Sequence, residues 1–260
     1  MGSSELQGKL WGAAATEWSE LAEPAMVPVY QAVFDALGIT KGTRLLDAGC
    51  GAGLALQLAD ARGASVTGLD ASAGLLAVAR ARVPSATLQE GELEALPYPD
   101  HGFDAVTAFN SVQYATDPVA ALRELGRVGV AGGPVAVVTW AEAGRCETRV
   151  VLAAIGGLLP PPPPGAGGPF ALSAPGKLEG LVSAAGLTPL RAGEVSAPFV
   201  FPDLDTSVRA HLSAGPARRA IKHAGQQATA DAIRASFAAS RKPDGSYRQD
   251  NAYRYLIATA

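Results

Sequence analysis

Apolar residues follow two spacings along this chain. Short, nearly continuous apolar runs are typical of buried strands, and they alternate with stretches whose apolar residues recur every three or four positions, as on one face of a helix. Strands that alternate with helices imply an α/β protein with a doubly wound, mostly parallel sheet. The runs lie at 45–47, 64–70, 86–89, 103–109 and 134–140, and helical stripes begin near Leu54, Ser72 and Asp117.

The segments outside 43–140 are expected to supply covers for one edge of this sheet and further elements of the core. Helix-like stretches at 24–37 and 203–241 belong to the covers, whereas a helix at 177–185 and a strand ending at Phe201 resume the core and 251–260 is the last strand. The prolines at 160–164 favour an extended connector. We therefore expect a single domain over 1–260, with an N-terminal lid at 1–40, a core at 43–140 and inserted caps at 141–174 and 203–241. Two caps on one sheet edge predict a closed pocket for a small, largely apolar molecule.

An apolar strand ends in an acidic residue, Asp47, and a glycine-rich turn follows at once. Glycines let the backbone pass close to a ligand, and a helix that begins near Leu54 aims its N–H groups at that ligand. A carboxylate at the strand tip disfavours a pyrophosphate but suits a cationic amino group. A dinucleotide fingerprint needs Gly or Ala at the sixth position from Gly49, where this chain has Leu54. The expected cofactor residues are Asp47, Gly49, Cys50, Gly51 and Gly53.

The run from Leu45 to Gly53 resembles the first motif of the class I S-adenosylmethionine-dependent methyltransferases. The resemblance implies a seven-stranded, Rossmann-like sheet and S-adenosylmethionine as the cofactor. Within that class the chain resembles the small-molecule enzymes of the quinone-biosynthesis C-methyltransferase type. Four segments in the expected order, between about 43 and 140, carry the resemblance.

The second segment ends in Asp70, whose carboxylate can accept hydrogen bonds from both hydroxyls of a ribose. Asp70 could instead cap the following helix, but its neighbour Ser72 is the better N-cap. We expect Ala71 and Ser72 to lie beside the cofactor. Leu75 either packs on the adenine face or belongs to the helix core.

The third and fourth segments supply the remaining candidates in the core. Glu92 directly follows a glycine and resembles the acidic residue of the family's adenine loop, although the family more often has Asp there. Leu93 follows with its backbone N–H. The fourth strand ends near Phe109, and ligands of open α/β sheets lie at such strand ends. The candidates are Asn110 and Ser111 toward the methionine portion and Gln113 and Tyr114 toward the substrate, or else a strand cap and a core aromatic.

Four residues of the lid and the second cap complete the candidates. Trp11 and Trp18 are seven apart, which places them on one helical face, either in the core or as an aromatic wall. In the second reading Trp11 covers the cofactor and Trp18 lines the substrate pocket. His211 or His223 could take a proton from a hydroxyl acceptor, unless both are surface residues of cap helices.

Charge and composition narrow the class of partner. The chain has 260 residues, a formal net charge of −3 and no basic run, so nucleic acid is not expected as a substrate. Two cysteines cannot form a disulfide framework, and the N-terminus lacks the pattern of a signal peptide. No apolar run approaches the ~20 residues of a membrane span. We expect a cytoplasmic protein, a monomer or homodimer, with no metal and no membrane partner.

The function that these patterns predict is transfer of a methyl group from S-adenosylmethionine to a small, largely apolar molecule. Bacterial secondary metabolism, in the sense of natural-product biosynthesis, is the expected setting. The alternative is a non-methylating, cyclase-like enzyme or a binding protein that keeps S-adenosylmethionine or S-adenosylhomocysteine as a ligand. An intact cofactor site is compatible with all three.

Overall fold

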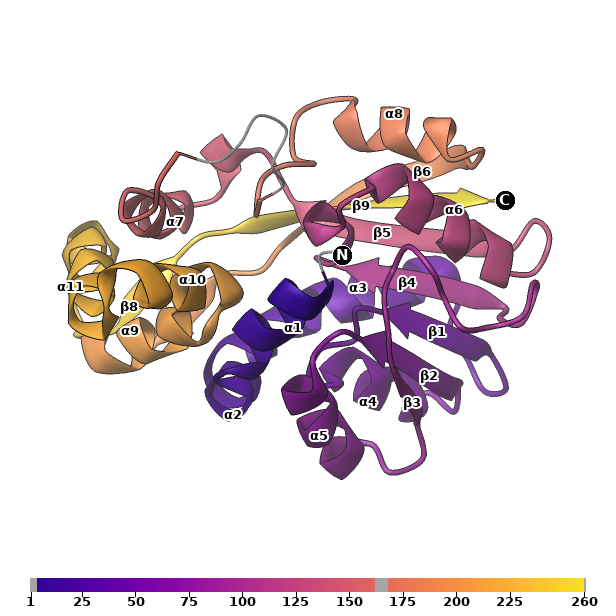
Figure 1. Cartoon of the computed structure of the whole chain (residues 1–260), viewed down its shortest axis with the longest axis horizontal. Helices are drawn as coiled ribbons and strands as arrows, with labels where there is room; N and C mark the ends of the chain where they lie inside the picture. Colours follow the sequence, from indigo (N-terminus) through magenta and orange to yellow (C-terminus); the bar gives the residue numbers. More distant parts are fainter. Residues whose placement is uncertain (1–3, 162–167, 260) are drawn as a thin grey trace.

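A seven-stranded sheet forms the centre of the computed structural model, which describes residues 4–161 and 168–259 (Figure 1). The strand order is β3-β2-β1-β4-β5-β9-β6, with the first five strands parallel and β9 antiparallel to both of its neighbours. The predicted sheet is thereby confirmed. The strands are β1 (Arg44–Ala48), β2 (Ser65–Asp70), β3 (Thr87–Glu90), β4 (Ala105–Phe109), β5 (Pro134–Trp140), β6 (Thr188–Ser196) and β9 (Ala252–Thr259).

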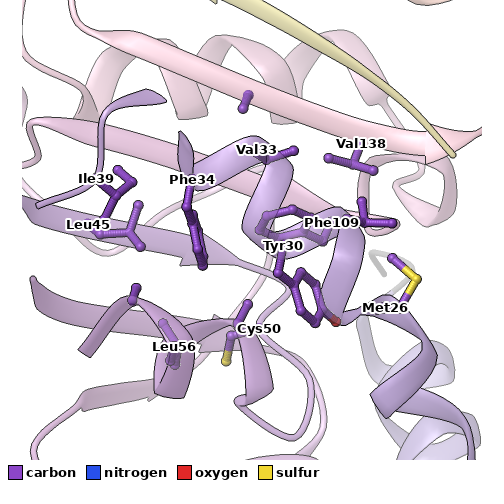
Figure 2. Close-up of a cluster of buried hydrophobic side chains, with 14 of the residues drawn as sticks. Met26, Tyr30, Val33, Phe34, Ile39, Leu45, Cys50, Leu56, Phe109 and Val138 are labelled. Atoms are coloured by element: carbon purple, nitrogen blue, oxygen red, sulfur yellow. The ribbon is translucent and has the colours of Figure 1, made fainter. Parts of the chain in front are cut away.

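Helices cover both faces of the sheet, as parallel strands require. Successive side chains of a strand point to opposite faces, so Leu45 and Leu46 of β1 enter two different apolar clusters. Figure 2 shows the first cluster, in which Tyr30, Val33 and Phe34 lie beside residues of the sheet. The helices on this face are α3 (Val27–Leu37), α4 (Leu54–Asp60) and α5 (Ala73–Arg82), and the opposite face carries α6 (Pro118–Val128) and α8 (Lys177–Ala184).

A separate cap gathers on the left of Figure 1, beyond the ends of the strands. Its helices pack around an apolar cluster that includes Val151, Phe201, Ile233 and Phe237. The cap confirms the predicted helical character of 203–241. The predicted strand ending at Phe201 is present as β7, but it pairs with β8 in a separate two-stranded ribbon and, contrary to expectation, does not belong to the central sheet. Most of the proline run at 160–164 lies outside the described residues. The cap elements are α7 (Arg149–Gly156), β7 (Phe199–Phe201), α9 (Leu204–Ser213), α10 (Gly215–Ala224), α11 (Gln226–Ser236), η5 (Ala238–Ser240) and β8 (Tyr247–Gln249), and the short η4 (Ala143–Arg145) precedes α7.

The N-terminal lid lies between this cap and α5, which agrees with its contacts to both (Figure 1). The prediction that Trp11 and Trp18 share one helical face is wrong, because the helix breaks at Ala13 and Ala14 and resumes in a different form. The two rings nevertheless meet edge to face, with centroids 4.9 Å apart. The pieces are α1 (Ser4–Gly12), α2 (Ala15–Glu17), the π-helix η1 (Trp18–Ala22) and the 3-10 helix η2 (Glu23–Met26).

After β4 the chain forms a short 3-10 turn, η3 (Val112–Tyr114), beside the carboxyl ends of the strands. In the part of the chain that the structure describes, no helix is both long and apolar enough to span a bilayer.

Candidate active site

A cavity of about 210 Å³ opens at the carboxyl ends of β1, β2, β4 and β5. The lid and described residues of both segments 141–174 and 203–241 contribute to its walls. One end, which we call the cofactor end, is built from the glycine turn and the ends of β1 and β2. The other, the cap end, lies against the cap. Predicted residues that line the cavity are Trp11, Trp18, Asp47, Gly49, Cys50, Gly51, Asp70, Ala71, Leu75, Glu92, Leu93, Asn110, Ser111, Tyr114 and His211.

The glycine turn is held tightly against the end of β4. Gly49 has a φ of +85°, and a Cβ at this position would lie 2.3 Å from the Cβ of Ser111. The Ser111 hydroxyl in turn donates to the carbonyl of Ala48 at 2.8 Å. Gly53 does not line the cavity, contrary to its predicted role, because it faces Ala79 of α5 and serves as the N-cap of α4.

Asp47 presents a buried carboxylate to the cavity. Asp47 is 1 % exposed, and one of its carboxylate oxygens accepts a 2.8 Å hydrogen bond from the Thr107 hydroxyl. Burial, together with the nearby carboxylates of Asp70 and Glu23, raises the pKa of Asp47 to about 7. A cation placed beside this group favours its ionised form, so the site suits an ammonium group.

Asp70 is fixed by backbone hydrogen bonds on both of its oxygens. The N–H groups of Gly51 and Ser72 each donate to it at 2.8 Å. Burial raises the pKa of this carboxyl, against the effect of those hydrogen bonds. Each oxygen retains acceptor capacity toward the cavity. Ser72 itself does not line the cavity, because its hydroxyl caps α5 by accepting from the N–H of Leu75 at 3.1 Å. Its role as N-cap is confirmed.

The lid closes over the predicted adenine loop. The Ser4 hydroxyl donates to the carboxylate of Glu92. Gly8 packs so closely that a Cβ there would lie 2.1 Å from the Ala71 carbonyl oxygen. Leu75 and Leu93 add apolar surface to the same region of the cavity. This end therefore combines an acidic acceptor with apolar walls.

Gln113 does not reach the cavity, in contrast to its predicted contact with substrate. Its side chain is 1 % exposed, and its Nε2 donates to Oδ1 of Asn110 at 3.2 Å. Asn110, with a left-handed φ of +50°, does line the cavity. Gln113 thus contacts Asn110 and not the cavity, while its neighbour Tyr114 lines the cavity beside Trp11, with ring centroids 5.8 Å apart.

Glu23 is a cavity residue that the sequence reasoning missed. It is 2 % exposed, forms an ion pair with Arg82 and accepts from the N–H of Leu54 at 3.4 Å. Arg82 also donates to the Ala52 carbonyl at 2.9 Å, so the pair joins the lid to the glycine turn. Burial raises the pKa of Glu23 even though Arg82 opposes the change. No motif signals the pair, because its members are 59 residues apart.

The two candidate histidines occupy different environments. His211 is 8 % exposed and lines the cap end of the cavity. His223 lies on the exposed surface near the end of α10 and does not line the cavity, so its predicted role is wrong. Sequence spacing could not separate them, because both belong to cap helices. Aromatic residues that the sequence reasoning also missed complete the walls: Tyr30, Phe109, Trp140, Phe199, Phe201 and Tyr253.

The charges of the cavity match S-adenosylmethionine better than a dinucleotide. Among residues 4–161 and 168–259, five carboxylates line the cavity and no lysine or arginine does. A pyrophosphate would meet repulsion there, whereas an ammonium and a sulfonium would be attracted. Asp70 offers acceptors for ribose hydroxyls, and Leu75 and Leu93 offer apolar surface for an adenine. The residues present therefore fit the cofactor.

Comparisons with known proteins agree with this fit. Residues 46–137 match the model of a family described as "Methyltransferase domain". An uncharacterized protein of Mycobacterium tuberculosis is 35 % identical over 131 residues, which cover 49 % of this chain and 48 % of the relative. The demethylmenaquinone methyltransferase of Renibacterium salmoninarum is 36 % identical over 110 residues, covering 42 % of this chain and 46 % of the relative.

Among solved structures, the [4+2]-cyclase SpnF superposes with a TM-score of 0.57 at 24 % identity, covering 89 % of this chain and 80 % of SpnF. At that identity the likeness concerns the fold. Together with the fold, the family match supports a methyltransferase domain over residues 46–137 of this chain. The chain spans slightly less than half the length of the curated relatives described above.

Proposed function

We propose that this protein transfers a methyl group from S-adenosylmethionine to a small, largely apolar molecule. The observation that carries the proposal is the two-ended cavity. Its cofactor end holds the carboxylates Asp47, Asp70 and Glu92, whereas its cap end is lined by aromatic side chains. A charged cofactor and an apolar acceptor can thus share one enclosed space.

Binding and exclusion of water are the main tasks of this chain in the reaction. When bound, the cofactor supplies a methyl group that its sulfonium already activates. In this proposal Asp47 binds the amino group and Asp70 the ribose, with Glu92 and Leu93 beside the adenine; all four residues line the cavity. Trp11 and Trp18 close the lid side, which excludes water and holds the acceptor for in-line attack.

His211 is the candidate proton acceptor in this proposal. Burial lowers its pKa to about 4, so the ring is neutral near pH 7 but is a weak base. A carbon or hydroxyl acceptor that loses its proton easily is therefore better matched to the site than a weakly acidic one. Positioning contributes more to the rate than proton removal does.

The setting of the reaction belongs to the same proposal. The apolar cap end supports a small-molecule acceptor, and bacterial natural-product biosynthesis is the setting that we propose for it. A cavity without lysine or arginine among its described lining residues is unsuited to nucleic acid. Cys50 and Cys146 are free and buried, which suits the reducing cytoplasm. Monomer and homodimer are both compatible with the proposal.

Calorimetric titration with S-adenosylhomocysteine, S-adenosylmethionine and NADH tests the cofactor assignment first. Micromolar binding of the two adenosyl ligands without NADH binding is expected; preference for NADH would refute the assignment. Incubation with candidate acceptors and a cofactor labelled in its methyl group then tests transfer. Turnover of an acceptor with no label gained would point to the cyclase-like alternative.

A further inference from the structure

One imidazole interrupts the aromatic wall at the cap end of the cavity. The ring of His211 lies edge to face against three phenylalanines, with centroid distances of 5.8 Å to Phe199, 5.8 Å to Phe201 and 5.0 Å to Phe237. Phe199 and Phe201 belong to β7, Phe237 lies in the turn after α11, and His211 belongs to α9. A polar atom in such an enclosure has few protein partners, so its hydrogen bonds decide what it can bind.

The hydrogen bonds of His211 determine which nitrogen is free. Its Nδ1 lies 2.9 Å from the carbonyl oxygen of Ser207, one helical turn earlier in α9. A carbonyl can only accept, so Nδ1 carries the proton and Nε2 of the neutral ring carries a lone pair. The lowered pKa of His211 agrees with this neutral form.

Within 4–161 and 168–259, the Nε2 atom of His211 has one hydrogen-bond contact, and that contact is long. The Thr148 hydroxyl lies 3.4 Å away, near the limit for a hydrogen bond, and both residues line the cavity. A shorter bond from a ligand would satisfy Nε2 better than Thr148 does. The group able to form that bond is a donor, because Nε2 can only accept in this tautomer.

Charge around the cavity restricts the ligand further. The charged side chains that line it are the carboxylates of Glu23, Asp47, Asp70, Glu92 and Glu94, and no lysine or arginine of the described residues joins them. An anionic ligand would find no counter-charge on the described side chains that line the cavity, and its burial would be costly. The aromatic walls favour apolar surface instead.

We propose that the methyl acceptor is an uncharged, apolar molecule with a hydroxyl or N–H group, and that Nε2 of His211 accepts a hydrogen bond from that group. This inference rests on the proposed function and deepens it by naming the substrate class. His211 is then a specificity-determining residue. The bound donor group need not be the atom that receives the methyl.

Three bicyclic probes that differ in one substituent test the inference. They are 2-naphthol, which has a donor, 2-methoxynaphthalene, which has none, and 2-naphthoate, which is an anion. Each is titrated at pH 7 into the full chain saturated with S-adenosylhomocysteine, whose own binding is measured in the same sample. We expect 2-naphthol to bind about tenfold more tightly than 2-methoxynaphthalene, and 2-naphthoate to bind least.

Variants assign the preference to one atom. His211→Phe, which keeps an aromatic ring in the cage, should abolish the tenfold preference for 2-naphthol. His223→Phe is the matched control, since that residue is exposed on the same cap, and it should leave the preference unchanged. Thr148→Val removes the competing hydroxyl and should retain the preference or increase it, which provides a second test if His211→Phe does not fold.

The outcomes separate this inference from the proposed function. Failure of S-adenosylhomocysteine to bind refutes the proposed function, and the inference falls with it. With that ligand bound, the inference alone is overturned by absence of 2-naphthol binding, by equal binding of 2-methoxynaphthalene or by tighter binding of 2-naphthoate. Loss of the preference in Thr148→Val, or its survival in a folded His211→Phe variant, also overturns it.

Discussion

The two ends of the cavity are built in different ways. At the cofactor end, Asp47 and Asp70 directly follow apolar strand residues; backbone N–H groups of the adjoining turns hold Asp70, and the Thr107 hydroxyl of β4 holds Asp47. At the cap end, Trp140, Phe199 and His211 come from three segments that are far apart in the chain. The comparison teaches that polar contacts to a fixed ligand are encoded in local motifs. An apolar chamber depends instead on how distant elements pack.

The largest expected effect is at the buried carboxylate of the cofactor end. Asp47→Ala should weaken binding of S-adenosylhomocysteine by about 3 kcal/mol, close to complete loss, because a charged hydrogen-bond partner of the amino group is removed. Calorimetry measures the affinity, and thermal denaturation checks that the variant is folded. Normal binding by a folded variant would show that the amino group is held elsewhere.

The next effect concerns the ribose acceptor. Asp70→Ala should weaken cofactor binding by ~1–3 kcal/mol, since a buried pair of hydroxyls loses its acceptor and the N–H groups of Gly51 and Ser72 lose theirs. The exposed lid residue Glu20 provides a matched control, and Glu20→Ala should bind as the unmodified protein does. An unchanged affinity in Asp70→Ala would remove the ribose assignment.

The pH dependence of cofactor affinity provides a further test of the cofactor end. The pKa of Asp47 is raised to about 7, so binding of a cationic amino group requires loss of a proton below that pH. Affinity for S-adenosylhomocysteine should therefore be about tenfold weaker at pH 6 than at pH 8. Glu23 on the lid and Asp70 on β2 face the same carboxyl, and their raised pKa values add to the trend.

Stability without cofactor should show the opposite dependence. Because the pKa of Asp47 is higher in the folded state than in the unfolded state, the folded state holds a proton between about pH 4 and pH 7. The free energy of unfolding contributed by this group therefore falls as pH rises through that range. Urea denaturation measures it, and Asp47→Asn should flatten the slope. An equally steep slope in that variant would assign the proton to another carboxyl.

A smaller effect is expected at Glu23. A variant at this position tests whether Glu23 acts on the amino-acid part of the cofactor or on the nucleoside part. Glu23→Gln should weaken S-adenosylhomocysteine binding about fivefold and leave 5′-methylthioadenosine binding unchanged, because only the first ligand has an ammonium group. Glu20→Gln is the control. Equal weakening of both ligands, with a lower melting temperature, would mean that the Arg82 ion pair only stabilises the lid.

The smallest effect is expected at the cap end. Phe199→Leu should change the affinity for S-adenosylhomocysteine less than twofold, since Phe199 lies among the cap aromatics beside Trp140 and His211. The same variant should weaken 2-naphthol binding, because it removes aromatic surface beside His211. A large loss of cofactor affinity would break the distinction between the two ends.

Local patterns predicted much of the fold and a large part of the cofactor end. Ser72 was correctly identified as the N-cap of α5, since an apolar stripe begins just after it. Gln113 and Gly53 were misplaced because sequence neighbours of a site residue can face the protein interior. Glu23 was missed because its ion pair with Arg82 depends on tertiary packing.

The sequence by itself determined the strand and helix alternation, the glycine turn after Asp47 and the acidic residue at the end of β2, since short-range geometry and strand periodicity impose these features. Only the tertiary structure decided that Trp11 and Trp18 meet across a broken helix, that His211 and not His223 reaches the cavity, and that Glu23 lies over the turn. Those features depend on packing between segments far apart in the chain, and spacing along the sequence does not specify which way the side chains of such segments point.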